Sequence, residues 1–417
     1  MKSCYVPGRA VSGVPRTLGT YLGGATAARA GDEMSGPAVL LLGFAVAGRP
    51  ATGSELLAAV IIAGAAGGPV FGALLDRSYR PDRLLAATLA AYALGIVAIA
   101  VFVGRLPMPV VVAIALAAGL FNPAVAGGWT SQLPRMVTGR ELERGSALDA
   151  MTYSAASLAG PALAALVAAG LGARVAVLVA AALVALAVPA AWSLPGYPPP
   201  RARAAGLTPQ APHRQMAAQM AGGFAVIAAC RPLLRATLTS VVSYVGIGML
   251  IVCCPVLGSE RLGAPSRGAL LISAIAAASL TANAILARLP RRGGPDVRVL
   301  SSTLVIGASM AAAAVAPGWL ILPAVALGGA GEGPQLTAVF AVRHRETPDH
   351  MRGQVYTTAA SMKIAGMAAG AAVAGPLAGR SVTGCLLVAA GTELCAAAAY
   401  LLAGASWAGR ARMQAVP

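Results

Sequence analysis

Charged and aromatic residues are scarce in this chain. Of its 417 residues, 11 % are charged and 5 % are aromatic, whereas 58 % are hydrophobic. A water-soluble domain covers its surface with charges on about a quarter of its residues. The few polar residues gather in short segments between apolar stretches of roughly 20 residues, the length that crosses a bilayer as a helix. The composition excludes an ordinary soluble protein and predicts a polytopic, all-α membrane protein.

Several catalytic signatures are also missing. The chain has two lysines, Lys2 and Lys363, and neither follows a glycine, so there is no phosphate-binding GK[ST] loop. No GxSxG is present. His213, His344 and His350 all fall outside the apolar stretches, which leaves no histidine for an embedded metal or hydrolase site. The six cysteines form no CxxC pair. We therefore expect no enzymatic activity, no bound metal and no cofactor.

Positive charge is abundant, with 31 Lys plus Arg against 14 Asp plus Glu and a net charge of +17. In a soluble chain this would suggest nucleic acid, but here the cations lie between apolar runs, as orientation signals do. With the N-terminus inside, 23 cations fall in inner segments and six fall in outer ones, while Arg29 and Lys363 lie within spans. This bias predicts cytoplasmic termini and an even number of spans.

Twelve apolar windows are long enough to span a membrane. The first of them is longer than a bilayer requires and contains Gly36-Pro37, so we expect a tilted or kinked helix there. The windows cover residues 18–47, 54–75, 84–104, 109–130, 147–170, 174–193, 235–257, 267–289, 298–316, 318–342, 355–378 and 383–404.

The two halves of the chain repeat one another. The segment from Gly72 to Arg80 is echoed from Asn283 to Arg291 at an offset of 211, and Arg144-Gly145 is echoed by Arg352-Gly353 at an offset of 208. Parallel repeats of six spans are an architecture of transporters with a central site. We expect a bundle in residues 1–193, a proline- and arginine-rich cytoplasmic linker in 194–234 and a second bundle in 235–417.

The loop after the second window contains a motif that is typical of one protein family. Gly72-x-x-x-Asp76-Arg77-x-x-Arg80 resembles the signature loop of the major facilitator superfamily. The resemblance covers nearly the whole chain and implies two pseudo-symmetric six-helix bundles, with this loop latching the cytoplasmic side. We expect Asp76 at a helix N-terminus, with Arg77 and Arg80 as its partners. The alternative is that these arginines serve as orientation signals alone.

The second copy of this loop is degenerate. Ala287 stands where the first copy has Asp76, so a second latch would depend on Arg288 and Arg291.

Two further features refine the resemblance. Gly160-Pro161 in the fifth span resembles the antiporter motif that accompanies export in the family, although Ala164-Ala165 stand where a glycine pair is usual and Gly375-Pro376 is a similar pair elsewhere. Gly31-Asp32-Glu33 and Leu133-Pro134-Arg135 are similar to the drug and siderophore exporter branch.

Three charges lie inside the first span. Arg29 precedes Asp32 and Glu33 by three and four residues, so all three share one helical face and an internal ion pair is possible. A charge facing lipid costs about 2.5–3.5 kcal/mol on insertion scales, which predicts a water-filled cavity beside them. A carboxylate there could carry protons, with Asp32 the first candidate and Glu33 the second. The alternative is a static pair that fixes helix packing.

Further polar groups lie in other spans. Glu332 in the tenth span could pair with Lys363 in the eleventh or bind substrate, unless Lys363 snorkels to the rim. Glu393 is expected to be structural. Side chains that could offer hydrogen bonds to a ligand, or simply pack helices, are those of Asn122, Tyr153, Tyr244, Asn283, Gln335 and Tyr356.

The sequence thus predicts a monomeric, gradient-driven transporter in a bacterial plasma membrane, a source indicated by the richness in alanine, glycine and arginine. Its partners would be a small-molecule substrate, protons and lipid, with no nucleic acid. The expected mechanism is proton-coupled export by alternating access. Uptake symport or uncoupled facilitation is the alternative within transport, and a non-transporting membrane sensor or assembly factor is the alternative from another class. Sequence alone does not identify the substrate.

Overall fold

A computed structural model describes residues 14–47, 50–195, 212–264, 267–288 and 294–413. Within these ranges every regular element is a helix, and no strand is present. Twelve membrane spans form two six-helix bundles, as the sequence predicts.

The first bundle contains spans one to six. Its helices are α1 (Val14–Ala47), α2 (Pro50–Arg77), α3 (Pro81–Phe102), α4 (Met108–Gly119), α6 (Gly139–Leu171) and α7 (Ala173–Trp192). Pro81 occupies the first turn of α3, where its missing N–H costs no hydrogen bond. Gly172 has φ 93°, which allows the tight reversal between α6 and α7.

The fourth span is interrupted. After α4 the chain continues as η1 (Asn122–Ala124), α5 (Gly127–Thr130) and η2 (Leu133–Arg135). Pro123 removes a backbone donor, and Gly127 and Gly128 weaken the helix further. Instead of the single helix predicted over 109–130, the span is α4 followed by three very short helices, of which η1 carries Asn122 and α5 carries Thr130.

The second bundle contains spans seven to twelve. Its elements are α9 (Arg231–Leu262), α10 (Gly268–Arg288), α11 (Pro295–Val315), η5 (Gly318–Leu320), α12 (Ile321–Glu346), η6 (Asp349–Met351), α13 (Arg352–Arg380) and α14 (Val382–Met413). The linker between the bundles contains a further helix, α8 (Pro212–Ala229), and the seventh span begins at Arg231, four residues before the predicted window.

Ten helices in the described ranges are long and apolar enough to cross a membrane by length and composition. The two remaining spans, α1 and α12, are more polar. Helix α1 contains Arg29, Asp32 and Glu33, and α12 contains four glycines around Glu332. These two spans therefore carry groups that would be costly against lipid.

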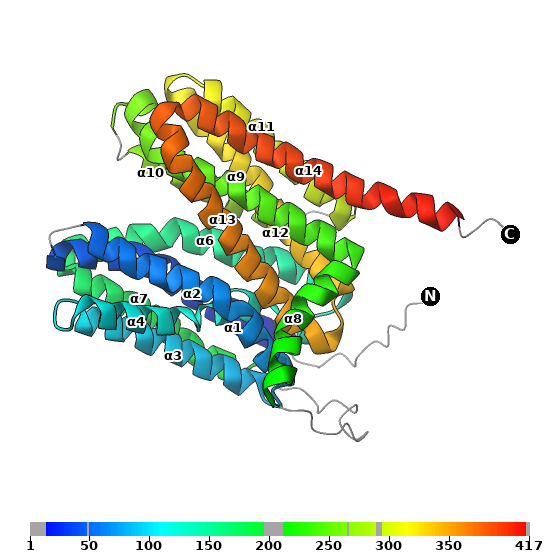
Figure 1. Cartoon of the computed structure of the whole chain (residues 1–417), viewed down its shortest axis with the longest axis horizontal. Coiled ribbons are helices and arrows are strands. Elements are labelled where there is room, and N and C mark those ends of the chain that lie inside the picture. Colours follow the sequence, from blue (N-terminus) through cyan, green and yellow to red (C-terminus); the bar gives the residue numbers. More distant parts are fainter. Residues whose placement is uncertain (1–13, 48–49, 196–211, 265–266, 289–293, 414–417) are drawn as a thin grey trace.

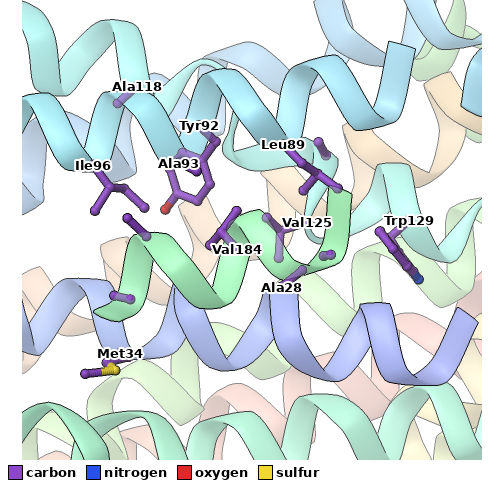
Figure 2. Packing of buried hydrophobic residues seen from close by; sticks show 14 of the residues in the cluster. Ala28, Met34, Leu89, Tyr92, Ala93, Ile96, Ala118, Val125, Trp129 and Val184 are labelled. Atoms are coloured by element: carbon purple, nitrogen blue, oxygen red, sulfur yellow. The ribbon is translucent and has the colours of Figure 1, made fainter. Parts of the chain in front are cut away.

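Each bundle has its own apolar core. The first core runs from Tyr21 to Leu194 and the second from Ile247 to Ala390. Figure 2 shows Val184 of α7 lying between Ala28 of α1 and Tyr92 of α3 in the first core. Because the two cores are separate, each bundle can pack as a unit, and the interface between the bundles belongs to neither core.

Contacts between the bundles follow the pseudo-symmetry. Helix α2 packs on α13, and α6 packs on α10, so equivalent helices of the two repeats exchange equivalent contacts. Figure 1 shows α13 crossing from the second bundle toward the end of α2. We call the end where α2 and α12 finish and α3 and α13 begin the arginine-rich end, because Arg77, Arg80, Arg345 and Arg352 lie there.

Candidate functional site: a charged cavity between the bundles

A cavity of about 420 Å³ lies between the bundles, within the size range of small-molecule sites. Both bundles contribute to its wall. Its charged lining residues are Asp32, Glu33, Glu332, Arg343 and Lys363, and its principal uncharged polar residues are Tyr92, Asn122, Tyr153, Tyr244 and Tyr356. Among the described residues, no ion pair joins any two of the five charged groups.

Asp32 lies half-buried on the wall formed by the first bundle. Its Oδ1 accepts hydrogen bonds from the Tyr92 hydroxyl at 2.6 Å and from Asn122 Nδ2 at 2.7 Å. The broken fourth span supplies Asn122, because the residue begins η1 where the helix has ended. Two donors fix one oxygen of Asp32, while the carboxylate as a whole stays in contact with the cavity.

Glu33, the next residue, also faces the cavity. Ser157 of α6 donates a hydrogen bond to its Oε1 at 3.1 Å. Gly160 lies one turn further along α6, and a Cβ added there would lie 2.7 Å from the Cβ of Glu33. The glycine of the predicted antiporter motif therefore lets α6 approach α1 at this carboxylate. The side chain of Pro161 is exposed on the other side of α6.

The ion pair that the sequence allows between Arg29 and a carboxylate of its own helix does not form. Arg29 instead pairs with Asp149 of α6, Nη1 to Oδ1 at 2.8 Å, and the two side chains are 2 % and 0 % exposed. Tyr21 donates to the same Oδ1 at 2.7 Å, and Thr130 donates to Oδ2 at 3.0 Å. The guanidinium carbon also lies 3.6 Å from the ring centroid of Tyr153.

This network leaves Arg29 outside the cavity lining. Because its charge is neutralised by a buried partner, Arg29 holds α1 against α6, and Asp32 and Glu33 remain without a paired cation. The static-pair alternative thus describes Arg29, but with a partner 120 residues away in the sequence.

Glu332 and Lys363 meet through a tyrosine. The Tyr244 hydroxyl donates to Glu332 Oε1 at 3.1 Å, and Lys363 Nζ lies 4.3 Å from the centroid of the same ring. Lys363 also lies 5.6 Å from the ring centroid of Tyr153. The direct ion pair considered for Glu332 and Lys363 is absent among the described residues, and Lys363 faces the cavity instead of the membrane rim.

Arg343 is a cavity residue that sequence reasoning placed in a loop. The predicted window ended at residue 342, whereas α12 continues to Glu346, so Arg343 and His344 lie inside the bundle at 3 % and 6 % exposure. His344 Nδ1 lies 3.1 Å from Ser146 Oγ, a contact between the bundles. His344, which the sequence places outside the apolar windows, is therefore buried in the last turn of α12.

Two of the predicted ligand-binding side chains lie elsewhere. Asn283 is fully buried and accepts a hydrogen bond from Thr337 at 2.9 Å. Gln335 donates to Thr303 at 2.8 Å and contacts Ser243. Neither residue lines the cavity.

Glu393 also lies outside the cavity lining. It is fully buried and accepts a hydrogen bond from Ser243 at 2.9 Å, in keeping with its predicted structural role.

At the arginine-rich end, Asp76 joins the two bundles. Its Oδ1 accepts the backbone N–H of Gly353 at 2.6 Å, and its Oδ2 accepts that of Gln354 at 2.8 Å. These N–H groups belong to the first turn of α13, where unsatisfied donors and the helix dipole favour an anion. A Cβ added at Gly72 would lie 2.6 Å from the Cα of Gln354, so a glycine is needed for this approach.

The proposed partners of Asp76 need correction. Arg80 pairs with Asp82 at 3.0 Å, within the same bundle, and Arg77 forms no ion pair among the described residues. The cations whose charges act on Asp76 are Arg135 and Arg352. In the second copy, Arg288 is exposed at the end of α10 and Arg291 lies outside the described residues.

Sequence analysis did not identify three residues of the site or its surroundings, although the sequence contains an indication of each. Asp149 and Arg343 are charges next to or within apolar windows, and such positions indicate buried partners or cavities. Tyr92 interrupts an otherwise aliphatic run in α3. Their partners come from other spans, so spacing along one helix could not identify them.

The comparisons with known proteins agree with this architecture. The model of the Major Facilitator Superfamily matches residues 21–371. The crystal structure of the human organic anion transporter MFSD10 is similar at a TM-score of 0.74 and 15 % identity, covering 94 % of this chain and 100 % of that one. A bacterial homologue of the iron transporter ferroportin, in an outward-facing state, has a TM-score of 0.75 at 15 % identity, covering 94 % of this chain and 100 % of its own.

The E. coli fucose:proton symporter FucP is similar at a TM-score of 0.68 and 12 % identity, covering 94 % of this chain and 99 % of that one. At these identities the likeness shows the fold alone. No curated protein sequence matches the chain. Because the family model spans most of the sequence and the fold agrees, this chain belongs to the Major Facilitator Superfamily.

Proposed function

We propose that the protein is a secondary active transporter that exports a small organic molecule in exchange for protons by alternating access. The observation that carries the proposal is the interfacial cavity, in which charged side chains from both bundles form no ion pair with any residue that the structure describes. An unpaired charge in a membrane interior is costly, and its retention indicates a role in binding or proton transfer.

Asp32 and Glu33 are the proposed proton carriers. The charge of Arg29 is used by Asp149, so protonation of Asp32 breaks no ion pair. Protonation removes a negative charge from the wall that contacts substrate. A proton and a cationic or hydrogen-bonding group of the substrate therefore compete for the same carboxylates, which is the linkage that exchange requires.

The closed end supplies the gate. Few polar contacts among the described residues join the bundles. They include the Asp76 cap and the 2.8 Å hydrogen bond between Ser154 and Ser279. We propose that residues 1–193 and 235–417 rock against each other, that 194–234 connect them, and that the cavity then opens at the arginine-rich end. The arginine bias supports a cytoplasmic position for this end and for both termini.

Gly160 supports exchange over the alternatives, because it brings the antiporter-like segment of α6 against Glu33. Uptake symport and uncoupled facilitation use the same cavity and differ in how protons and substrate are linked. A sensor without transport would bind ligand at this site and produce no flux.

The test is transport in everted membrane vesicles with an imposed pH gradient. A panel of a lipophilic cation, a neutral drug and a siderophore-like anion is scored by collapse of the gradient and by accumulation. Asp32→Asn should abolish gradient-driven accumulation and leave substrate exchange partly intact.

Glu393→Gln is the matched control, since it neutralises a buried acid outside the cavity and should preserve coupling. Equal gradient-driven flux in Asp32→Asn and the unaltered protein would remove Asp32 from the proposed role. Binding of a panel compound without flux of any of the three would favour a sensor.

A further inference from the structure

The charges around the cavity are unevenly distributed. Asp32, Glu33 and Glu332 form an acidic group, and the charges that act on Glu33 include both other acids and Lys363. Lys363 is in turn influenced by Glu332 and Glu33. Lys363 therefore acts on two of the three carboxylates, Glu33 and Glu332, and this part of the cavity has more acidic than basic groups.

Arg343 is a cation in the cavity wall that lacks an anionic partner among the described residues. It is 3 % exposed and lines the cavity, yet its Nε and Nη2 have no hydrogen-bond partner. Its titratable neighbours are the neutral tyrosines Tyr356, Tyr153 and Tyr244, together with the cation Lys363, which repels it.

No carboxylate in the described part of the chain forms an ion pair with Arg343. A guanidinium offers a planar fork of donors that matches a carboxylate or phosphate. An unsatisfied one that faces a cavity is a site for an anionic group.

The two charged regions lie at different depths. Glu332 and Arg343 are both on α12, eleven residues apart. At 1.5 Å per residue this is about 16 Å along the helix axis, and both side chains lean toward the helix N-terminus, the longer arginine further than the glutamate, which shortens the gap between their charges. A ligand that reaches both regions must carry its two charges roughly 10 Å apart.

The wall around these polar regions is apolar. Leu57 and Ile61 of α2, Ile251 of α9 and Ile272 of α10 line the cavity. They suit a hydrocarbon or ring segment between two polar ends.

We infer that the substrate is an elongated bipolar organic molecule, with an anionic group bound by Arg343 and an ammonium bound by the acidic group. This inference rests on the proposed function, in which protons compete at those carboxylates, and adds the anionic end that the proposed mechanism does not require.

Three probes with the same hydrocarbon chain test the inference: 8-aminooctanoate, octanoate and octylamine. Affinities are measured by calorimetric titration of the full chain in lipid nanodiscs. The unaltered protein should bind 8-aminooctanoate at least tenfold more tightly than either singly charged probe, because each of those leaves one region unpaired.

Arg343→Gln should lower the affinity for 8-aminooctanoate and octanoate at least tenfold and change that for octylamine less than twofold. Arg343→Lys should restore part of the loss. Arg345→Gln is the matched control, because this neighbour is 46 % exposed and pairs with Asp296 away from the cavity. Each variant is first checked for a single gel-filtration peak and an unchanged melting curve.

Equal affinity for the three probes, binding of none of them, or loss of octylamine binding together with the others in Arg343→Gln would overturn the inference. Gradient-driven flux of octylamine, blocked by Asp32→Asn and unaffected by Arg343→Gln, would keep the proposed function and reject the bipolar substrate. Arg343-dependent binding of 8-aminooctanoate without gradient-driven flux would support the bipolar site and reject the proposed function.

Discussion

At the scale of single residues, the neutralisation of Arg29 decides how the cavity works. Arg29, Asp149 and their neighbours Tyr21 and Thr130 form a closed, buried network next to two carboxylates that have no such partner. Arg29 and Asp149 neutralise each other away from the cavity lining, whereas Asp32 and Glu33 line it without a paired cation among the described residues.

Asp149→Asn should strongly destabilise the protein. The substitution leaves Arg29 as an uncompensated buried charge, a change that costs about 3–5 kcal/mol in proteins. Thermal unfolding of the purified chain should show a fall in melting temperature of several degrees. The double variant Arg29→Met with Asp149→Leu should recover much of the loss, because it removes both charges. An unchanged melting temperature for Asp149→Asn alone would show that the pair contributes little.

Sequence patterns predicted the residues of the first span better than their partners. The spacing of Arg29, Asp32 and Glu33 identified a charged helix face, and Asp32 and Glu33 do line a cavity. Spacing along one helix cannot identify Asp149, because that partner is set by how α1 packs on α6. Arg343 was misplaced because a hydropathy window ends at the first charge, whereas the helix continues.

At the scale of elements, the proposed gate is the contact between the end of α2 and the start of α13. Asp76 at the end of α2 caps the start of α13, and Gly72 provides the room one turn earlier. This contact could be predicted in part, because the motif has a glycine and an acid at fixed spacing. The helix whose N–H groups bind Asp76 could not be predicted, and neither could the break in the fourth span that positions Asn122.

Asp76→Asn should weaken the closed state. The amide keeps one acceptor oxygen and loses the charge that the helix dipole favours, a change of about 1–2 kcal/mol, which is a factor of roughly 5–30 in the population of the open form. Spin labels at Tyr79 and His350, both exposed, report the separation of the two bundles at this end in a background without native cysteines. The long-distance population should grow.

Asp82→Asn is the control for this measurement, since Asp82 pairs with Arg80 inside the first bundle and should leave the distances unchanged. The same distance distribution in Asp76→Asn and the parent would mean that the cap does not hold the end shut.

At the scale of the whole molecule, two separately packed bundles share one cavity and touch through equivalent helices. Composition and the arginine bias predicted twelve spans, and the internal repeat predicted two bundles. The charges of the first span predicted a cavity beside them, but its lining could not be predicted, since its shape depends on side chains from α1, α6, α9, α12 and α13 meeting across the interface. In the proposed mechanism, this cavity is reached from one side of the membrane at a time.

Ala360 of α13 lines the cavity, and Ala360→Cys adds a small thiol there in the background without native cysteines. The decisive measurement is the rate at which a membrane-impermeant cationic methanethiosulfonate modifies this thiol in right-side-out and in inside-out vesicles. Modification should be at least tenfold faster from the side opposite the arginine-rich end, and adding Asp76→Asn should raise the rate from the arginine-rich end. Equal modification rates from both sides that do not change when Asp76→Asn is added, or no modification from either side, would contradict alternating access to this cavity.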